Sequence, residues 1–178
     1  KLVLLLVAFL CLFSYNVKAQ GADCANADPF CTATAGYTFP ASTSTTAQVG
    51  PNYGCLGTQP NPAWYYFNIS TSGNIVIDLT NSAGVDIDFA AWGPFASQAA
   101  MCAGTSASPI DCSYSTAAVE QVNISGAIAG EWYMLVITNF ANVPTNITAS
   151  VGTGTTGATN CAILCNMTAL SATVGPCV

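Results

Sequence analysis

Short segments in which every second residue is apolar recur across residues 64–151, and they constrain the fold more than any other feature of the sequence. In residues 74–80, for example, Ile75, Ile77 and Leu79 fall on one face of an extended strand. Gly, Pro, Asn and Ser mark turns between the segments, and a helical period of about 3.6 residues does not recur after the leader. The pattern predicts an all-β chain folded as an antiparallel β-sandwich.

The individual strands follow from these segments and their flanking turns. Gly93-Pro94 ends one of them, because proline cannot continue a central strand pair. Residues 131–138 are apolar on both faces, which indicates a strand at the centre of a sheet. A helical turn is expected only near residues 96–101. The predicted strands are Tyr37–Pro40, Trp64–Ile69, Asn74–Thr80, Val85–Trp92, Val119–Ile124, Glu131–Thr138 and Asn146–Val151.

Residues 1–19 have the pattern of a cleavable secretory signal peptide. Lys1 precedes an apolar run at residues 2–13, and a Val-x-Ala site ends at Ala19, just before Gln20. The run is shorter than the roughly 20 residues that a membrane-spanning helix needs. We therefore expect export of the remainder, with no membrane insertion after cleavage.

The exported part has no cationic side chain. The sequence has two Lys or Arg residues and no His, and Lys1 and Lys18 both precede the cleavage site. Nucleic-acid binding is excluded, because it depends on cations that neutralise phosphates. A Ser-His-Asp or Cys-His catalytic group needs a base that this sequence lacks. The expectation is that the chain is not an enzyme.

Cysteines predict a disulfide framework. Nine occur, Cys11 lies in the leader, and an even number remains in the exported part. Zinc is disfavoured, because His and a repeated Cys-x-x-Cys spacing are missing. Spacing does not fix connectivity. The favoured pair is Cys102–Cys112, which flanks one loop, and the other expected pairs are Cys31–Cys55, Cys24–Cys161 and Cys165–Cys177.

Residues 20–151 are predicted to form the sandwich, with an irregular, Cys-rich start that runs to about residue 60. Residues 152–178 begin as a Gly/Thr-rich linker and continue into one strand candidate, Met167–Val174. A lone strand has nothing to pair with. We interpret this segment as the truncated start of a following module, so neighbouring β-modules of the same chain are expected partners.

The sequence from Trp64 to Val151 resembles the jelly-roll module of the bacterial pre-peptidase C-terminal type. The matching features are an aromatic strand, a Ser-Gly turn, Asp-x-Asp-Phe before Trp-Gly-Pro-Phe, and Gly-Glu-Trp-Tyr-Met-Leu-Val at residues 130–136. Tyr-Gly-Cys-Leu at residues 53–56 and Ile-Thr-Asn-Phe at residues 137–140 are similar to a variant near the N-terminus of large Bacteroidetes surface proteins. The resemblance implies a jelly-roll-like sandwich in an adhesin-like or gliding-associated protein exported by the type IX system.

Asp86 and Asp88 are the candidate metal ligands. They are two residues apart on one predicted strand and project from the same face, about 6–7 Å apart. Like charges repel there unless a cation or solvent intervenes, and Ca²⁺ prefers carboxylate oxygens. Asp78, on the neighbouring strand, could join them. Two alternatives remain open: the acids face water or accept turn hydrogen bonds, or a carboxylate pair, Asp86 with Asp88 or Glu120 with Glu131, hydrolyses a glycoside.

Trp64, Trp92 and Trp132 are candidate platforms for stacking on a sugar ring, although such rings more often pack in a core. The leading hypothesis is a non-catalytic structural or adhesive module of a multi-domain bacterial cell-surface protein. Its partner would be an unknown surface glycan or protein. The alternatives are a carbohydrate-binding module and an accessory domain of a secreted peptidase or other hydrolase.

Overall fold

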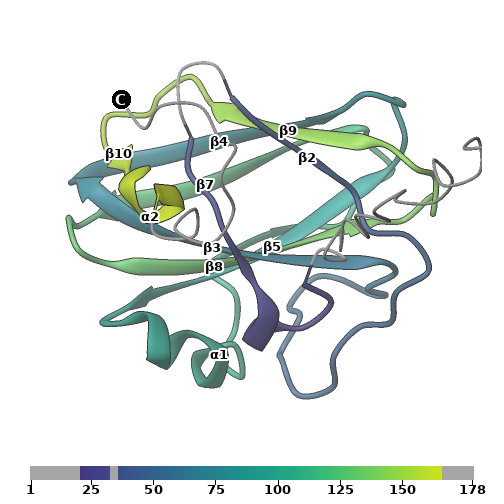
Figure 1. Cartoon of the computed structure of the whole chain (residues 1–178), viewed down its shortest axis with the longest axis horizontal. Helices are drawn as coiled ribbons and strands as arrows, with labels where there is room; N and C mark the ends of the chain where they lie inside the picture. The colour runs from purple at the N-terminus through teal and green to yellow at the C-terminus, as the bar shows by residue number, and fades with distance from the viewer. Residues whose placement is uncertain (1–20, 33–35, 166–178) are drawn as a thin grey trace, which may run out of the picture.

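The computed structural model describes residues 21–32 and 36–165. The predicted signal peptide and the strand candidate Met167–Val174 lie outside the described residues. Two β-sheets pack face to face, and short helices lie at the periphery (Figure 1). None of the described helices is long and apolar enough to cross a membrane. The prediction of an antiparallel β-sandwich is confirmed.

Sheet A has the strand order β1-β3-β8-β5-β6, and β10 also pairs with β3; sheet B has the order β2-β9-β4-β7. Among the described strand pairs, only β1 with β3 is parallel. The strands are β1 (Asp28–Pro29), β2 (Tyr37–Pro40), β3 (Pro62–Thr71), β4 (Gly73–Asn81), β5 (Ile87–Phe95), β6 (Asp111–Ser113), β7 (Val119–Ala127), β8 (Trp132–Asn139), β9 (Asn146–Val151) and β10 (Ala158–Thr159). The helices are η1 (Cys24–Asn26), η2 (Gln98–Ala100), α1 (Met101–Gly104) and α2 (Ala162–Cys165).

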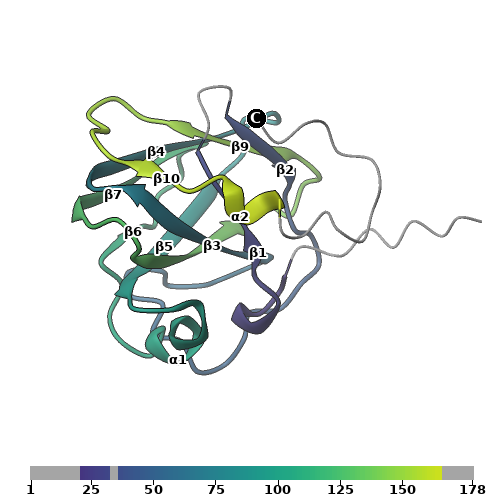
Figure 2. The ribbon, with the colours of Figure 1, turned by 60° about the vertical axis from the view of Figure 1, so that its left-hand side comes forward.

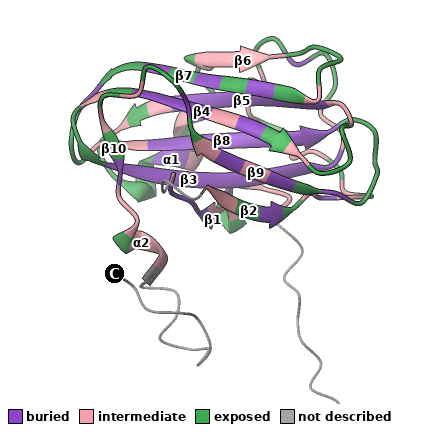
Figure 3. Ribbon diagram, turned by 90° about the horizontal axis from the view of Figure 1, so that it is seen from above, coloured by how far each residue is buried: buried purple, intermediate pink, exposed green. Residues whose placement is uncertain are grey.

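Sheet A is buried on both faces, and β3 shows this most clearly. Tyr65 and Phe67 pack between the two sheets, whereas Trp64 and Tyr66 pack in a second apolar cluster on the outer face. η1, α1 and the loop before β3 contribute residues to that second cluster, and Figure 2 shows α1 on the side of sheet A away from sheet B. β8 lies between β3 and β5 and is buried along its length (Figure 3), so the central position predicted for residues 131–138 is confirmed.

Several strand ends differ from the sequence-based prediction. β5 runs to Phe95, although Gly93-Pro94 predicts an earlier end. β6 pairs only with residues 89–91 of β5, so Pro94 interrupts no strand pair on that side. A register shift after Trp92 accommodates the proline on the β8 side. β1, β6 and β10 have only two or three residues each, too few to show an alternating pattern.

β10 lies beyond the predicted end of the sandwich at residue 151 yet belongs to the sandwich. Ala158 and Thr159 pair with β3. The Thr156 hydroxyl accepts a hydrogen bond of 2.9 Å from the backbone N–H of Asn74, on β4. The sandwich therefore continues past the predicted boundary at residue 151, because β3 is long enough to pair with both β1 and β10. A following module stays a prediction.

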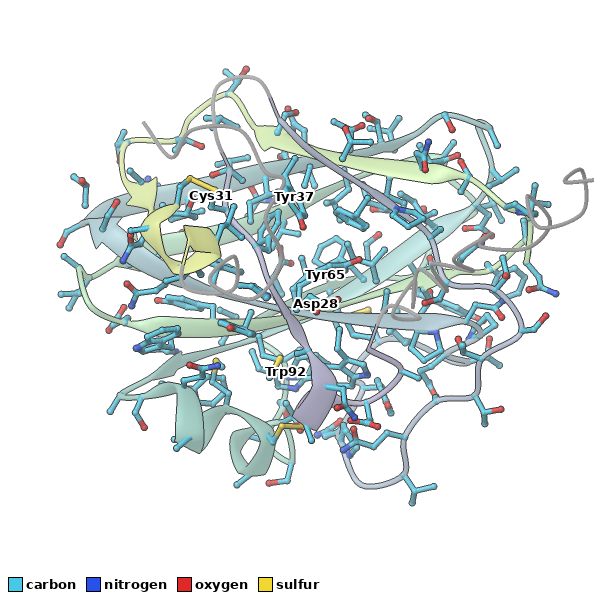
Figure 4. All side chains as sticks on the ribbon, viewed as in Figure 1. Asp28, Cys31, Tyr37, Tyr65 and Trp92 are labelled. Atoms are coloured by element: carbon cyan, nitrogen blue, oxygen red, sulfur yellow. A yellow bond between two sulfur atoms is a disulfide. The ribbon has the colours of Figure 1, made fainter. Side chains whose placement is uncertain are left out.

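Three disulfides join segments that are distant in sequence. They are Cys24–Cys102, Cys31–Cys161 and Cys55–Cys112, with sequence separations of 78, 130 and 57 residues. The Cys31 disulfide lies beside α2 (Figure 4). The predicted pairs Cys102–Cys112, Cys31–Cys55 and Cys24–Cys161 are wrong, because proximity in sequence does not determine which segments the fold makes neighbours. Cys177 lies outside the described residues, so the pair Cys165–Cys177 stays a prediction.

β7 forms one edge of sheet B, and a carboxylate covers part of that edge. The backbone N–H of Asn123 donates to Asp111 Oδ2, on β6, at 2.6 Å. The opposite edge strand, β2, has four residues and ends at Pro40. Unpaired strand edges are templates for pairing with other chains, and acidic side chains, prolines and short strands all reduce that risk.

Replacing Cys31 and Cys161 together with alanine should lower the free energy of unfolding by about 4–5 kcal/mol. The reason is that this disulfide closes a loop with a sequence separation of 130 residues in the unfolded chain. The matched variant replaces Cys55 and Cys112, whose smaller separation of 57 residues gives an expected loss of about 4 kcal/mol. Urea denaturation measures both losses. An unfolding midpoint equal to that of the wild type in the first variant would contradict the pairing.

Candidate functional site

Trp64 and Trp92 are core residues. They are 0 % and 1 % exposed, and their rings stack with centroids 5.3 Å apart. The Trp92 indole N–H donates to the carbonyl oxygens of Asn52 and Ala107, each at 3.2 Å. Figure 4 shows Trp92 on the side of sheet A away from Tyr37. The prediction that these two rings stack on a sugar is wrong, because the loop before β3 and the segment after α1 cover the outer face of sheet A.

Trp132 is the one predicted stacking residue that keeps partial exposure. Its ring centroid is 6.1 Å from that of Tyr66. Tyr66 also lines a hollow of about 500 Å³ between η1 and the η2–α1 segment, a volume typical of small-ligand sites. None of its lining residues carries a charge. They are Cys24, Ala25, Ala27, Tyr66, Gln98, Ala99, Met101, Cys102 and Met134.

Asp78 does not join Asp86 and Asp88. It lies on β4 in sheet B and accepts a hydrogen bond of 2.8 Å from the Gln121 side-chain amide. Asp86 and Asp88 lie at the start of β5, in sheet A. β4 and β5 follow each other in sequence but belong to different sheets. The prediction that Asp78 joins Asp86 and Asp88 is therefore wrong.

Glu120, on β7, is the third acid that lies near Asp86 and Asp88. Ser115 links it to Asp88: the Ser115 backbone N–H donates to Asp88 Oδ1 at 2.9 Å, and the Ser115 hydroxyl donates to Glu120 Oε1 at 2.6 Å. Asp88 is 1 % exposed and Glu120 8 %. We call Asp86, Asp88 and Glu120 the acidic cluster. No spacing in the sequence points to Glu120, because it lies in the other sheet.

The electrostatics of the acidic cluster follow from burial without a positive partner. The described residues contain no Lys, Arg or His. Burial is the main cause that raises the pKa of Asp88 to about 6; the charges of Asp86 and Glu120 also raise this pKa, whereas the Ser115 N–H and the Thr138 hydroxyl lower it. Burial, and then Glu120, also raise the pKa of Asp86. Ionisation of Asp88 near neutral pH therefore works against folding.

The second carboxylate pair considered for hydrolysis, Glu120 with Glu131, does not face a common substrate position. Glu131 adjoins the first residue of β8 and accepts hydrogen bonds of 2.8 Å from the Tyr133 hydroxyl and the Ile128 backbone N–H. Glu120 lies near Asp88, which pairs with Thr138 at the other end of β8. The length of β8 thus separates the two glutamates.

No family model matches the chain, and no curated protein matches it. Two solved structures match part of the chain. The pre-peptidase C-terminal domain of a collagenase from Bacillus anthracis is 16% identical over 71% of this chain and 94% of that chain, with a TM-score of 0.43. PliG from Aeromonas hydrophila, a periplasmic inhibitor of g-type lysozyme, is 14% identical over 71% of this chain and 96% of that chain, with a TM-score of 0.37.

Asp88→Asn should reduce the loss of stability that accompanies a rise in pH. The folded-state pKa of Asp88 lies above its ordinary value of 3.8, so its contribution to stability is present at acid pH and is lost as the pH rises toward about 6. Between pH 4 and pH 7 in a calcium-free buffer, the free energy of unfolding should fall by roughly 1–2 kcal/mol less in the variant than in the wild type. Urea denaturation at each pH measures the difference.

Asp88→Ala is the matched control. It removes the same charge but leaves the Ser115 N–H without its acceptor, so it should lower stability at every pH and share the pH dependence of Asp88→Asn. Parallel curves for the wild type and both variants would rule out Asp88 as the source of the effect.

Proposed function

We propose that the chain is a non-catalytic module of an extracellular protein, with a structural or adhesive role on a bacterial cell surface. The observation that carries the proposal is the use of six cysteines in three cross-links, which join η1 to α1, the segment after β1 to the segment after β10, and the loop before β3 to β6. Disulfides persist in oxidising, extracytoplasmic compartments, which supports export. Export by the type IX system, implied by the resemblance of the sequence, belongs to the same proposal.

The hydrogen bonds of the carboxylates support a non-catalytic role. Asp111 accepts from the backbone N–H of Asn123, Glu120 from the Ser115 hydroxyl, and Glu131 from a tyrosine hydroxyl and a backbone N–H. General acid–base catalysis of glycoside hydrolysis requires two carboxyl groups that flank one bond of the substrate. Here the carboxylates hold loops and strand edges in place instead.

The outer face of sheet B supports a neutral partner. Thr38, Thr148 and Thr80 lie directly opposite one another on β2, β9 and β4, and the hydroxyl oxygens of Thr38 and Thr148 are 2.9 Å apart. Gln121 and Asn123 expose their amides on β7, at the edge of the same sheet. Hydroxyl and amide groups offer both donors and acceptors, which suits a surface glycan or the backbone of another protein.

Carbohydrate binding is the second candidate function, and the position of Trp132 favours it. Trp132 is partly exposed beside Tyr66, which lines the uncharged hollow on the outer face of sheet A. Aromatic rings with a polar tip are common at binding sites, where one end contacts the partner and the other contacts water.

Retention on gels that contain neutral polysaccharides distinguishes the two functions. A carbohydrate-binding module should be retarded, and Trp132→Ala should abolish the retardation because it removes the only partly exposed ring among the three tryptophans. Phe140→Ala, which removes an exposed ring just beyond the other end of β8, is the control and should migrate as the wild type does. Retardation that Trp132→Ala leaves intact but Thr80→Ala abolishes would place an adhesive surface on sheet B instead. A structural module should show no retardation. Turnover of a glycoside, peptide or ester by the purified chain would contradict both functions.

A further inference from the structure

Three side chains that bear oxygen atoms meet on the outer face of sheet A, where β5 begins. Ile87 and Phe89 pack in the core between the sheets, so Asp86 and Asp88, which alternate with them, project to the other side. Thr138, on β8, is the residue directly opposite Asp88. Side chains of directly opposite residues share a face of the sheet, so the Thr138 hydroxyl lies next to the Asp88 carboxyl.

Each of these side chains has a buried oxygen atom with no hydrogen-bond partner at 3.5 Å or less, although the Thr138 hydroxyl is close enough to Asp88 to lower the pKa of its carboxyl. The atoms are Asp86 Oδ1, Asp88 Oδ2 and Thr138 Oγ1. Asp88 is 1 % exposed and Thr138 is 0 % exposed, so solvent does not reach them freely. Nearly all buried polar atoms in folded proteins have a partner, and a buried carboxylate is the costliest group to leave without one. Such oxygens are favourable ligands for a cation.

No described residue supplies that cation, because the two lysines of the sequence, Lys1 and Lys18, lie outside the described residues. Glu120 adds further negative charge near Asp86 and Asp88, and its Oε1 atom is already bound to the Ser115 hydroxyl. A positive ion from solution would therefore be attracted to this end of sheet A.

We propose that Asp86, Asp88 and the Thr138 hydroxyl form a Ca²⁺ site. All three groups offer oxygen, which hard cations prefer, and the nitrogen and sulfur ligands of zinc sites are missing. Within the described ranges no three acidic, Cys or His side chains are arranged to share a metal ion. The site therefore combines two carboxylates with a neutral hydroxyl and water. Ca²⁺ tolerates such irregular geometry, whereas Mg²⁺ demands a near-ideal octahedron.

The bound ion would fasten the start of β5 to the end of β8. Asp88 also accepts the N–H of Ser115, which lies in the connection between β6 and β7. One ion would therefore hold strands of sheet A and the chain that crosses to sheet B. This site is independent of the proposed adhesive or structural role.

Calorimetric titration of the exported chain, from Gln20 onward, with CaCl₂ tests the site directly. We expect about one Ca²⁺ per chain and a Tm that rises by roughly 5–10 °C when Ca²⁺ is a hundredfold above its Kd, relative to buffer with EDTA. Mg²⁺ should bind more weakly. Equal affinity for Mg²⁺, or no heat of binding and no shift of Tm with Ca²⁺, overturns the proposal.

Variants locate the ion. Asp88→Asn and Thr138→Val should each weaken Ca²⁺ binding at least about tenfold, because each removes one ligand. Asp78→Asn, on sheet B, is the matched control and should bind Ca²⁺ as the wild type does. If Asp88→Asn does not fold, Asp86→Asn and Thr138→Val carry the test. Binding that survives in these variants but is lost in Asp78→Asn places the ion elsewhere and refutes the assignment.

Discussion

β3 pairs with β8 from Pro62–Thr138 to Asn68–Trp132, and almost every residue of that ladder is shielded from water on both sides of the sheet. Burial on the sandwich side needs only sheet B. Burial on the other side needs an additional layer to cover Trp64, and that layer consists of loops and short helices with few strand hydrogen bonds of their own. Cys24–Cys102 and Cys55–Cys112 fix this layer covalently. The cross-links are thus a consequence of a sheet that has two apolar faces.

Much of the sandwich can be predicted from local pattern, since alternation reports which face of a strand is buried. All seven predicted strands are present, and Tyr37–Pro40 has the predicted bounds. Strands of two or three residues are missed by such a prediction, because they are too short to show the alternation of apolar and polar residues. The disulfides are missed for a different reason: each joins two segments that only the folded chain brings together, and sequence separations of 57 to 130 residues do not indicate which segments those are.

The candidate site shows the same division between local and distant information. Asp86 and Asp88 share a face because they are two residues apart, which the sequence indicates. Glu120 and Thr138 lie on β7 and β8, so only the folded arrangement of the strands brings them near Asp88. The burial of Trp64 had a usable signal, because the residues around it are apolar on both faces, just as residues 131–138 are. The burial of Trp92 had a weaker signal, because Asp86 and Asp88 share its face of the strand.

The hydrogen bond from Asn123 N–H to Asp111 has a consequence for how copies of this domain coexist. Many proteins place lysine on their edge strands, where it discourages pairing with another chain. This domain has no lysine from Gln20 onward. A carboxylate from β6 here occupies a backbone donor that an approaching strand would need, and it also repels the identical acid of a second copy. Two copies can then approach each other along this edge without merging into a continuous sheet.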